Sequence, residues 1–136
     1  VEDVALLPEV LVLDLQEQFL IPQAALRLWD VAHQFENLPV AAPVSDEVCN
    51  FASSLTQPYC GANATFEAVQ WLDSPQSVMS LALIPLRRSL SAPAFGMLVL
   101  GSPDPTRYTA DMGTEFLVRV GELASAAASR LLPPTE

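Results

Sequence analysis

Residues 95–117 read FGMLVLGSPDPTRYTADMGTEFL, and this stretch decides the fold. It opens with an apolar run of strand length that ends in Gly-Ser, and a turn broken by two prolines follows. Thr109 then supplies a helix N-cap signal ahead of an amphipathic pattern. The layout predicts the last strand of a sheet over residues 94–102 and a closing helix over residues 110–132.

The predicted closing helix carries two kinds of stripe. Its larger apolar side chains recur at helical spacing and predict a core-facing stripe, which comprises Met112, Phe116, Val120, Leu123 and Ala127. A second strip holds only small side chains, which are Gly121, Ala124, Ser125 and Ala128. Small side chains let another helix approach closely, and that helix belongs either to the same subunit or to a second copy of the chain. We predict a homodimer formed through these helices.

Upstream of this stretch, the chain predicts two further strands. Residues 78–86 are apolar on both faces, as are residues 94–102, which is typical of strands at the centre of a covered sheet. Residues 87–93 fit the loop of an antiparallel hairpin between them. Residues 23–31 alternate in side-chain character and predict a third strand.

Prolines and an N-cap delimit two upstream helices. The first begins near Glu9, and Pro22 prevents its continuation. Ser45 caps the second, whose apolar face comprises Val48, Phe51, Ala52 and Leu55. Residues 59–77 are irregular, and FEAVQWL within them fits either a short helix or a strand. The order of elements predicts an α+β domain in which helices flank a central antiparallel sheet.

Length and charge limit the classes of function. The 136 residues predict a single domain over residues 1–136, which begins at Val1 as a segment excised from a longer chain would. The first residues are acidic, unlike a signal peptide, so we expect a cytoplasmic protein. The net charge is −10 and the chain has no lysine. Nucleic acids and anionic membranes are bound by clustered basic side chains, so we expect neither as a partner.

The sequence holds no recognisable catalytic or metal-binding motif. His33 is its only histidine and lies in a polar stretch, so we expect a solvated side chain without a catalytic partner. Cys49 and Cys60 do not form a C-x-x-C motif, and we expect two free thiols. The glycines are too scattered for a phosphate-binding loop. We therefore expect no catalytic site, no metal and no cofactor.

Several motifs resemble those of the DUF484 family, whose members have a GAF-like fold. The resemblance covers nearly the whole chain and is carried by ALRLW at residues 25–29, YCG at 59–61, SLALIPL at 80–86 and, most specifically, FGMLVLGSPDPTRYTADMGTEFL. The family usually has phenylalanine where Tyr108 stands. The resemblance implies a central antiparallel sheet, a small-molecule pocket and terminal helices that often pair two subunits. It does not imply an enzyme.

In GAF-like folds a variable segment covers the pocket, and three residues flank that segment here: Tyr59, Cys60 and Trp71. Aromatic side chains around a cavity suit a flat or apolar ligand, or else they fill the core of the lid. Ser80 and Ala82 share one face of a predicted strand, where small side chains leave room for a ligand or for a packed helix. We predict a cavity between the sheet and residues 58–77, bordered by Tyr59, Trp71, Ser80 and Ala82.

Two charged residues complete the candidate set. Arg27 lies within an apolar strand, where it is solvated at a sheet edge, paired with an acid, or bound to an anionic ligand. Asp104 is expected to accept backbone N–H bonds within the turn. We predict a non-catalytic, dimeric GAF-like sensor or regulatory module that binds a small molecule. The alternative is an interaction scaffold whose pocket is filled by its own side chains.

Overall fold

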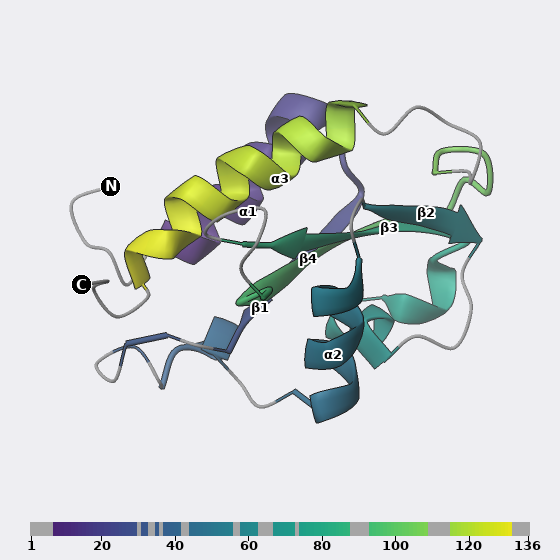
Figure 1. Ribbon diagram of the computed structural model, residues 1–136. Coiled ribbons are helices and arrows are strands. Elements are labelled where there is room, and N and C mark those ends of the chain that lie inside the picture. Colours follow the sequence, from purple (N-terminus) through teal and green to yellow (C-terminus); the bar gives the residue numbers. More distant parts are fainter. Residues whose placement is uncertain are drawn as a thin grey trace.

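Four strands pair antiparallel in one sheet, in the order β1-β4-β3-β2 (Figure 1). In this computed structural model the strands are β1 Gln23–Leu28, β2 Tyr59–Ala62, β3 Ser80–Leu86 and β4 Gly96–Ser102. The three strands expected from the sequence are present, and β1 and β3 both pair with β4, so the predicted α+β fold is confirmed. The structure describes residues 7–29, 31–32, 35, 37–41, 44–55, 58–62, 67–72, 74–87, 93–108 and 115–131.

Helices cover both faces of the sheet. α1 (Leu7–Phe19) and α3 (Glu115–Ala128) lie side by side over one face, which we call the α3 face. α2 (Asp46–Ser54) and the short 3₁₀-helix η4 (Glu67–Trp71) lie on the opposite face, which we call the α2 face. Further one-turn 3₁₀-helices among the described residues are η3 Pro39–Ala41, η5 Pro75–Ser77 and η6 Ser129–Leu131.

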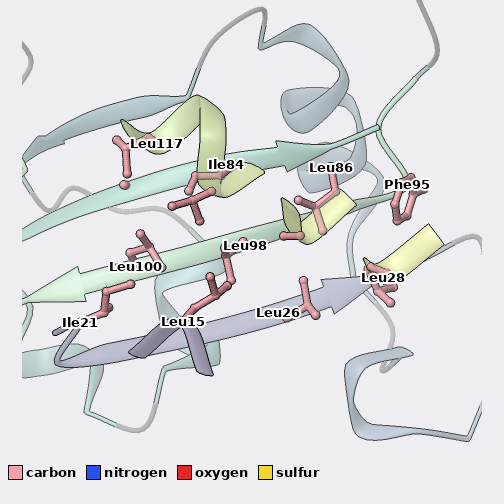
Figure 2. Close-up of a cluster of buried hydrophobic side chains, with 14 of the residues drawn as sticks. Leu15, Ile21, Leu26, Leu28, Ile84, Leu86, Phe95, Leu98, Leu100 and Leu117 are labelled. Atoms are coloured by element: carbon pink, nitrogen blue, oxygen red, sulfur yellow. The ribbon is translucent and has the colours of Figure 1, made fainter. Parts of the chain in front are cut away.

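Residue parity assigns the strand side chains to the two faces, because side chains alternate along a strand. Even-numbered side chains belong to the α3-face core, which Figure 2 shows with Leu98 of β4 between Leu26 of β1 and Ile84 of β3. Odd-numbered side chains belong to a second core on the α2 face, which includes Leu81, Leu83, Met97 and Val99. The expectation that β3 and β4 are covered on both faces is confirmed.

The small side chains of α3 form its core-facing side. Ala124 has no exposed surface and Ala128 is 1% exposed. A Cβ added to Gly121 would lie 2.7 Å from Ile84 Cγ2, so glycine lets the helix rest directly on β3. Leu123, which was expected in the core, is instead 52% exposed. Because the side chains on this face of the sheet are large, the space between the sheet and α3 admits only small helix side chains. This determines which side of α3 faces the sheet.

This packing corrects the predicted dimer strip. Gly121, Ala124 and Ala128 contribute to the subunit's own core, so their small size is no sign of a second copy. Ser125 is half-buried, and its hydroxyl accepts a hydrogen bond from the Arg87 backbone N–H at 3.2 Å. Four members of the predicted core stripe remain: Val120 is buried, Ala127 packs at the edge of the core, and Met112 and the Phe116 side chain lie outside the described residues.

Two arginines donate hydrogen bonds to backbone carbonyl groups at the C-terminal ends of α1 and α2. Arg107 donates hydrogen bonds to the carbonyl oxygens of Phe19 at 2.8 Å and Leu20 at 3.2 Å, where the chain leaves α1 with a Leu20 φ of 53°. Arg87 donates to three carbonyl oxygens at 3.1, 2.8 and 2.7 Å, those of Ala52, Ser53 and Leu55. Cationic donors satisfy the last carbonyls of a helix and interact favourably with its dipole. Both guanidinium groups therefore have structural partners.

The segment between α2 and β3 differs most from expectation. Ser45 caps α2 as predicted, since its hydroxyl accepts the Val48 N–H at 3.2 Å. Strand β2 was not expected, because its sequence YCGA is short and contains residues with little preference for strands. FEAVQWL, which fitted a helix or a strand, contains the 3₁₀-helix η4.

Candidate functional site

The sheet separates the residues that were predicted to bind a ligand. Tyr59 and Arg27 are odd-numbered and lie on the α2 face, where Trp71 of η4 also packs. The even-numbered members lie on the α3 face: Cys60, Ser80 and Ala82. The prediction of one cavity bordered by Tyr59, Trp71, Ser80 and Ala82 is therefore wrong, because the sheet lies between the first two residues and the last two.

Ser80 has a structural role at the start of β3. Its hydroxyl donates to the Asp104 carbonyl oxygen at 2.6 Å and accepts the Tyr108 N–H at 3.2 Å. The Asp104 carboxylate accepts hydrogen bonds from the backbone N–H and the hydroxyl of Thr106, at 2.9 and 2.7 Å. These bonds, the backbone one first, lower the pKa of Asp104. Ser80 thus holds the turn that follows β4 in place through these hydrogen bonds. The predicted structural role of Asp104 in that turn is confirmed.

Cys60 and Ala82 are partners across β2 and β3 and belong to the α3-face core. Ala82 has no exposed surface, which favours helix packing as the reason for its small size. Burial raises the pKa of the Cys60 thiol above its usual range. Cys49 lies on α2, on the other side of the sheet, and neither cysteine forms a disulfide.

Among the described residues, the Tyr108 hydroxyl is the buried side-chain polar group without a hydrogen-bond partner. Tyr108 is 1% exposed and packs in the α3-face core. Burial raises the pKa of its phenol, because the charged form loses its hydration there. Phenylalanine is the residue that the family resemblance leads us to expect at this position.

We expect Tyr108→Phe to stabilise the protein by about 1 kcal/mol, since a buried hydroxyl without a partner costs about 1–3 kcal/mol. Because the pKa of Tyr108 is raised in the folded protein, this group contributes stability below the usual tyrosine pKa. That contribution is lost as the pH rises from the usual pKa through the raised one. The variant should therefore also lose less stability at alkaline pH. Urea unfolding at neutral and alkaline pH measures both effects, and a loss of stability at neutral pH would contradict the prediction.

Arg27 and Trp71 meet on the α2 face. The guanidinium carbon of Arg27 lies 5.3 Å from the centroid of the Trp71 ring, a cation–π arrangement. Arg27 is half-buried on the edge strand β1, and its same-face neighbours Ala25 and Trp29 pack against the α2-face core. The Trp29 indole N–H donates to the Ala94 carbonyl oxygen at 2.9 Å. We give the name Arg27–Trp71 site to four residues: Ala25 and Arg27 of β1, Trp29 just after β1, and Trp71 of η4.

Gln23 fastens the segment after η4 to β1. Its side-chain amide donates to the Ser74 carbonyl oxygen at 3.1 Å and to the Ser77 hydroxyl at 2.9 Å, and it accepts the Ser74 N–H at 2.9 Å. This clamp holds the end of the segment that carries Trp71 next to the strand that carries Arg27. No sequence pattern marks Gln23, because its partners are distant in the chain and have no characteristic spacing.

Three further expectations from the sequence concern His33, metal ligands and membrane helices. His33 lies outside the described residues, so its expected solvation stays a prediction. Within the ranges that the structure describes, no three histidine, cysteine or acidic side chains gather as metal ligands would. In those same ranges, no helix combines the length and the apolar character needed to cross a membrane.

Comparisons with known proteins concern the family and the fold. A family model described as "Protein of unknown function, DUF484" matches residues 14–132. Among solved structures, the chain is similar to the type II free methionine-R-sulfoxide reductase from Thermoplasma acidophilum, with a TM-score of 0.52 and 13% sequence identity over 95% of this chain and 99% of that chain. At this identity the similarity shows the fold alone, and it confirms the GAF-like architecture. None of the curated proteins matches the chain.

Proposed function

Since the chain belongs to the DUF484 family of proteins of unknown function, we propose its function from its own structure. It is a non-catalytic GAF-like sensor module that binds a small molecule at the Arg27–Trp71 site and forms a homodimer through α1 and α3. One observation carries the ligand site: a half-buried guanidinium lies 5.3 Å from an indole ring on an apolar face.

The Arg27–Trp71 contact supports ligand binding by its chemistry. Ligand sites combine apolar and aromatic surface with a few polar groups that orient the ligand. Here the Trp71 ring supplies flat apolar area, and the Arg27 guanidinium supplies directional donors. The Gln23 clamp holds the neighbouring segment in place, which reduces the ordering that binding would require.

The cysteines support a non-catalytic role. Cysteine chemistry requires an accessible thiolate, whereas Cys60 is 7% exposed and burial raises the pKa of its thiol. Cys49 lies on the opposite side of the sheet, so the two thiols are not placed to form a disulfide with each other. For these reasons we do not propose for this chain the reductase activity in the name of the Thermoplasma protein.

Exposed apolar side chains on the helical layer support a dimer. Leu13 of α1 is 61% exposed, and on α3 Leu123 is 52% and Val118 is 38% exposed. These residues belong to two helices that lie side by side (Figure 1). Exposed apolar side chains of this kind are available to bury against a second copy of the chain. We propose this surface, in place of the small-residue strip, as the dimer interface.

A second candidate function is an interaction scaffold that binds no small molecule. Tyr59 and Trp71 are partly buried and pack against the α2-face core, as side chains that fill their own pocket would. The Tyr59 hydroxyl would lie only 2.8 Å from a Cβ on Gly61, so the Tyr59 ring lies along β2, next to Gly61 of the same strand. In this case the aromatic side chains occupy the place of a ligand.

Native mass spectrometry of protein purified under non-denaturing conditions tests the proposed function. We expect a dimer that carries a small adduct, which Trp71→Ala should lose while remaining dimeric and folded. Leu123→Asp should give a folded monomer that keeps the adduct, since Leu123 is exposed on α3. A wild-type protein that carries no adduct and is not stabilised by any member of a metabolite library would favour the scaffold. A wild-type monomer at high micromolar concentration would contradict the dimer.

A further inference from the structure

We infer that the ligand of the Arg27–Trp71 site is a carboxylate on a flat apolar body, such as an aromatic carboxylic acid. The inference rests on the proposed function and adds the chemical class of the ligand. It is carried by the contacts of the Arg27 guanidinium and by the side chains around it.

Arg27 differs from the other arginines whose side chains the structure describes, because it is half-buried and its guanidinium makes no hydrogen bond to described residues. Arg87 and Arg107 donate to carbonyl oxygens at helix ends, and Arg119 is exposed on α3. Arg107 also lies 5.3 Å from the centroid of the Tyr108 ring, so a ring contact alone does not set Arg27 apart. Arg27 is half-buried, and among the described residues its guanidinium contacts the Trp71 ring and makes no hydrogen bond or ion pair. A ring face attracts the positive charge but leaves the N–H donors in the guanidinium plane unused.

Those unused donors define the polar group of the ligand. An arginine presents its N–H groups as a planar fork, which matches the two oxygens of a carboxylate through parallel hydrogen bonds. Contact with the Trp71 ring restricts the orientation of that fork. The net charge of −10 does not attract anions to the molecule as a whole, so recognition has to come from this local group.

The neighbouring side chains define the rest of the ligand. Ala25 and Trp29 lie two residues to either side of Arg27, and both are partly buried against the α2-face core. Such a surface rewards a ligand that covers it with a flat apolar body, because that body and the surface both leave water. Inorganic phosphate gains nothing from this surface. We therefore expect aromatic carboxylates to bind better than phosphate and better than neutral aromatic amides.

Benzoate and benzamide test this inference, because they have nearly the same shape and differ in charge. The chain has two tryptophans, so a proton–nitrogen correlation spectrum of labelled protein shows two indole N–H signals, which Trp29→Phe assigns. We expect benzoate to shift the Trp71 signal in a saturable manner, and benzamide and inorganic phosphate to leave it in place. Arg27→Gln should weaken benzoate binding by about 10- to 100-fold, whereas Arg119→Gln should leave it unchanged.

Several results would overturn the inference. If benzamide binds as tightly as benzoate, or Arg27→Gln binds benzoate like the wild type, charge does not select the ligand, although the proposed function stands. If benzoate at about 10 mM leaves the Trp71 signal in place, the carboxylate class is wrong, and the adduct in native mass spectrometry decides the proposed function separately. Arg27→Lys keeps the charge without the planar fork and should bind benzoate with intermediate affinity. Signal dispersion in the same spectra verifies that each variant is folded.

Discussion

Ala124→Asp should destabilise the protein by about 3–5 kcal/mol, because it places an unpaired charge in the core. Ala124 has no exposed surface and packs with Leu117 and Val120 of α3 against the sheet. Small domains have a total stability of about 5–15 kcal/mol, so the variant should unfold at much lower urea concentration or fail to fold. Urea unfolding followed by circular dichroism measures the loss.

Ala126→Asp is the matched control for this substitution. Ala126 lies on the same helix but is exposed, so the same chemical change should alter the stability by less than about 0.5 kcal/mol. The two variants separate core packing from any general effect of an added charge on α3. A folded Ala124→Asp protein that differs from the wild type only in being monomeric would show that this side of α3 faces a second subunit.

Gly96→Ala should cost about 2–3 kcal/mol, because the first residue of β4 has no room for a methyl group. A Cβ on Gly96 would lie 2.5 Å from Leu28 Cδ2 and 2.8 Å from the Arg27 carbonyl oxygen. The second contact is with the backbone of the paired strand β1, which cannot move without disturbing the pairing of Leu28 with Gly96. Thermal unfolding of the wild type and the variant measures the difference.

Gly61→Ala provides the comparison for Gly96→Ala. A Cβ on Gly61 would lie 2.8 Å from the Tyr59 hydroxyl, which is the tip of a side chain and not backbone. The Tyr59 ring can rotate away, so we expect a loss of about 1 kcal/mol or less. Equal losses in the two variants would mean that the close approach of β1 and β4 does not limit the residue at Gly96.

The strands of this protein were predictable to different degrees. β3 and β4 are long apolar runs, and both of their faces are buried as that pattern predicts. β1 was predicted over residues 23–31 and ends at Leu28. β2 was missed, since four residues that include glycine and alanine carry too weak a pattern and are held by pairing with β3.

The rotation of α3 shows where hydrophobicity fails as a guide. A large apolar side chain such as Leu123 was expected in the core, and the small side chains beside it were expected at an interface. The structure has the opposite arrangement, with Ala124 buried and Leu123 exposed. The deciding quantity is the depth above Ile84, which admits glycine at Gly121 and no larger residue without a shift. That depth depends on the sheet and cannot be found in the helix sequence.

The candidate site was partly predictable. The sequence singled out Arg27, Tyr59 and Trp71 for their chemistry, and all three lie on the α2 face. It grouped them with Ser80 and Ala82, which point to the α3 face, because the pairing register of an unrecognised strand was unknown. The contact between Arg27 and Trp71 was not predicted, although both residues were named.

By itself, the sequence determined the family, the α+β class, the three longer strands and the capped start of α2. These features depend on apolar runs, alternation and capping residues within short windows of the chain. Only the tertiary structure decided which side of α3 is buried and which candidate residues share a face. Those outcomes depend on strand register and on the depth between packed layers, which are set by contacts between residues far apart in the chain.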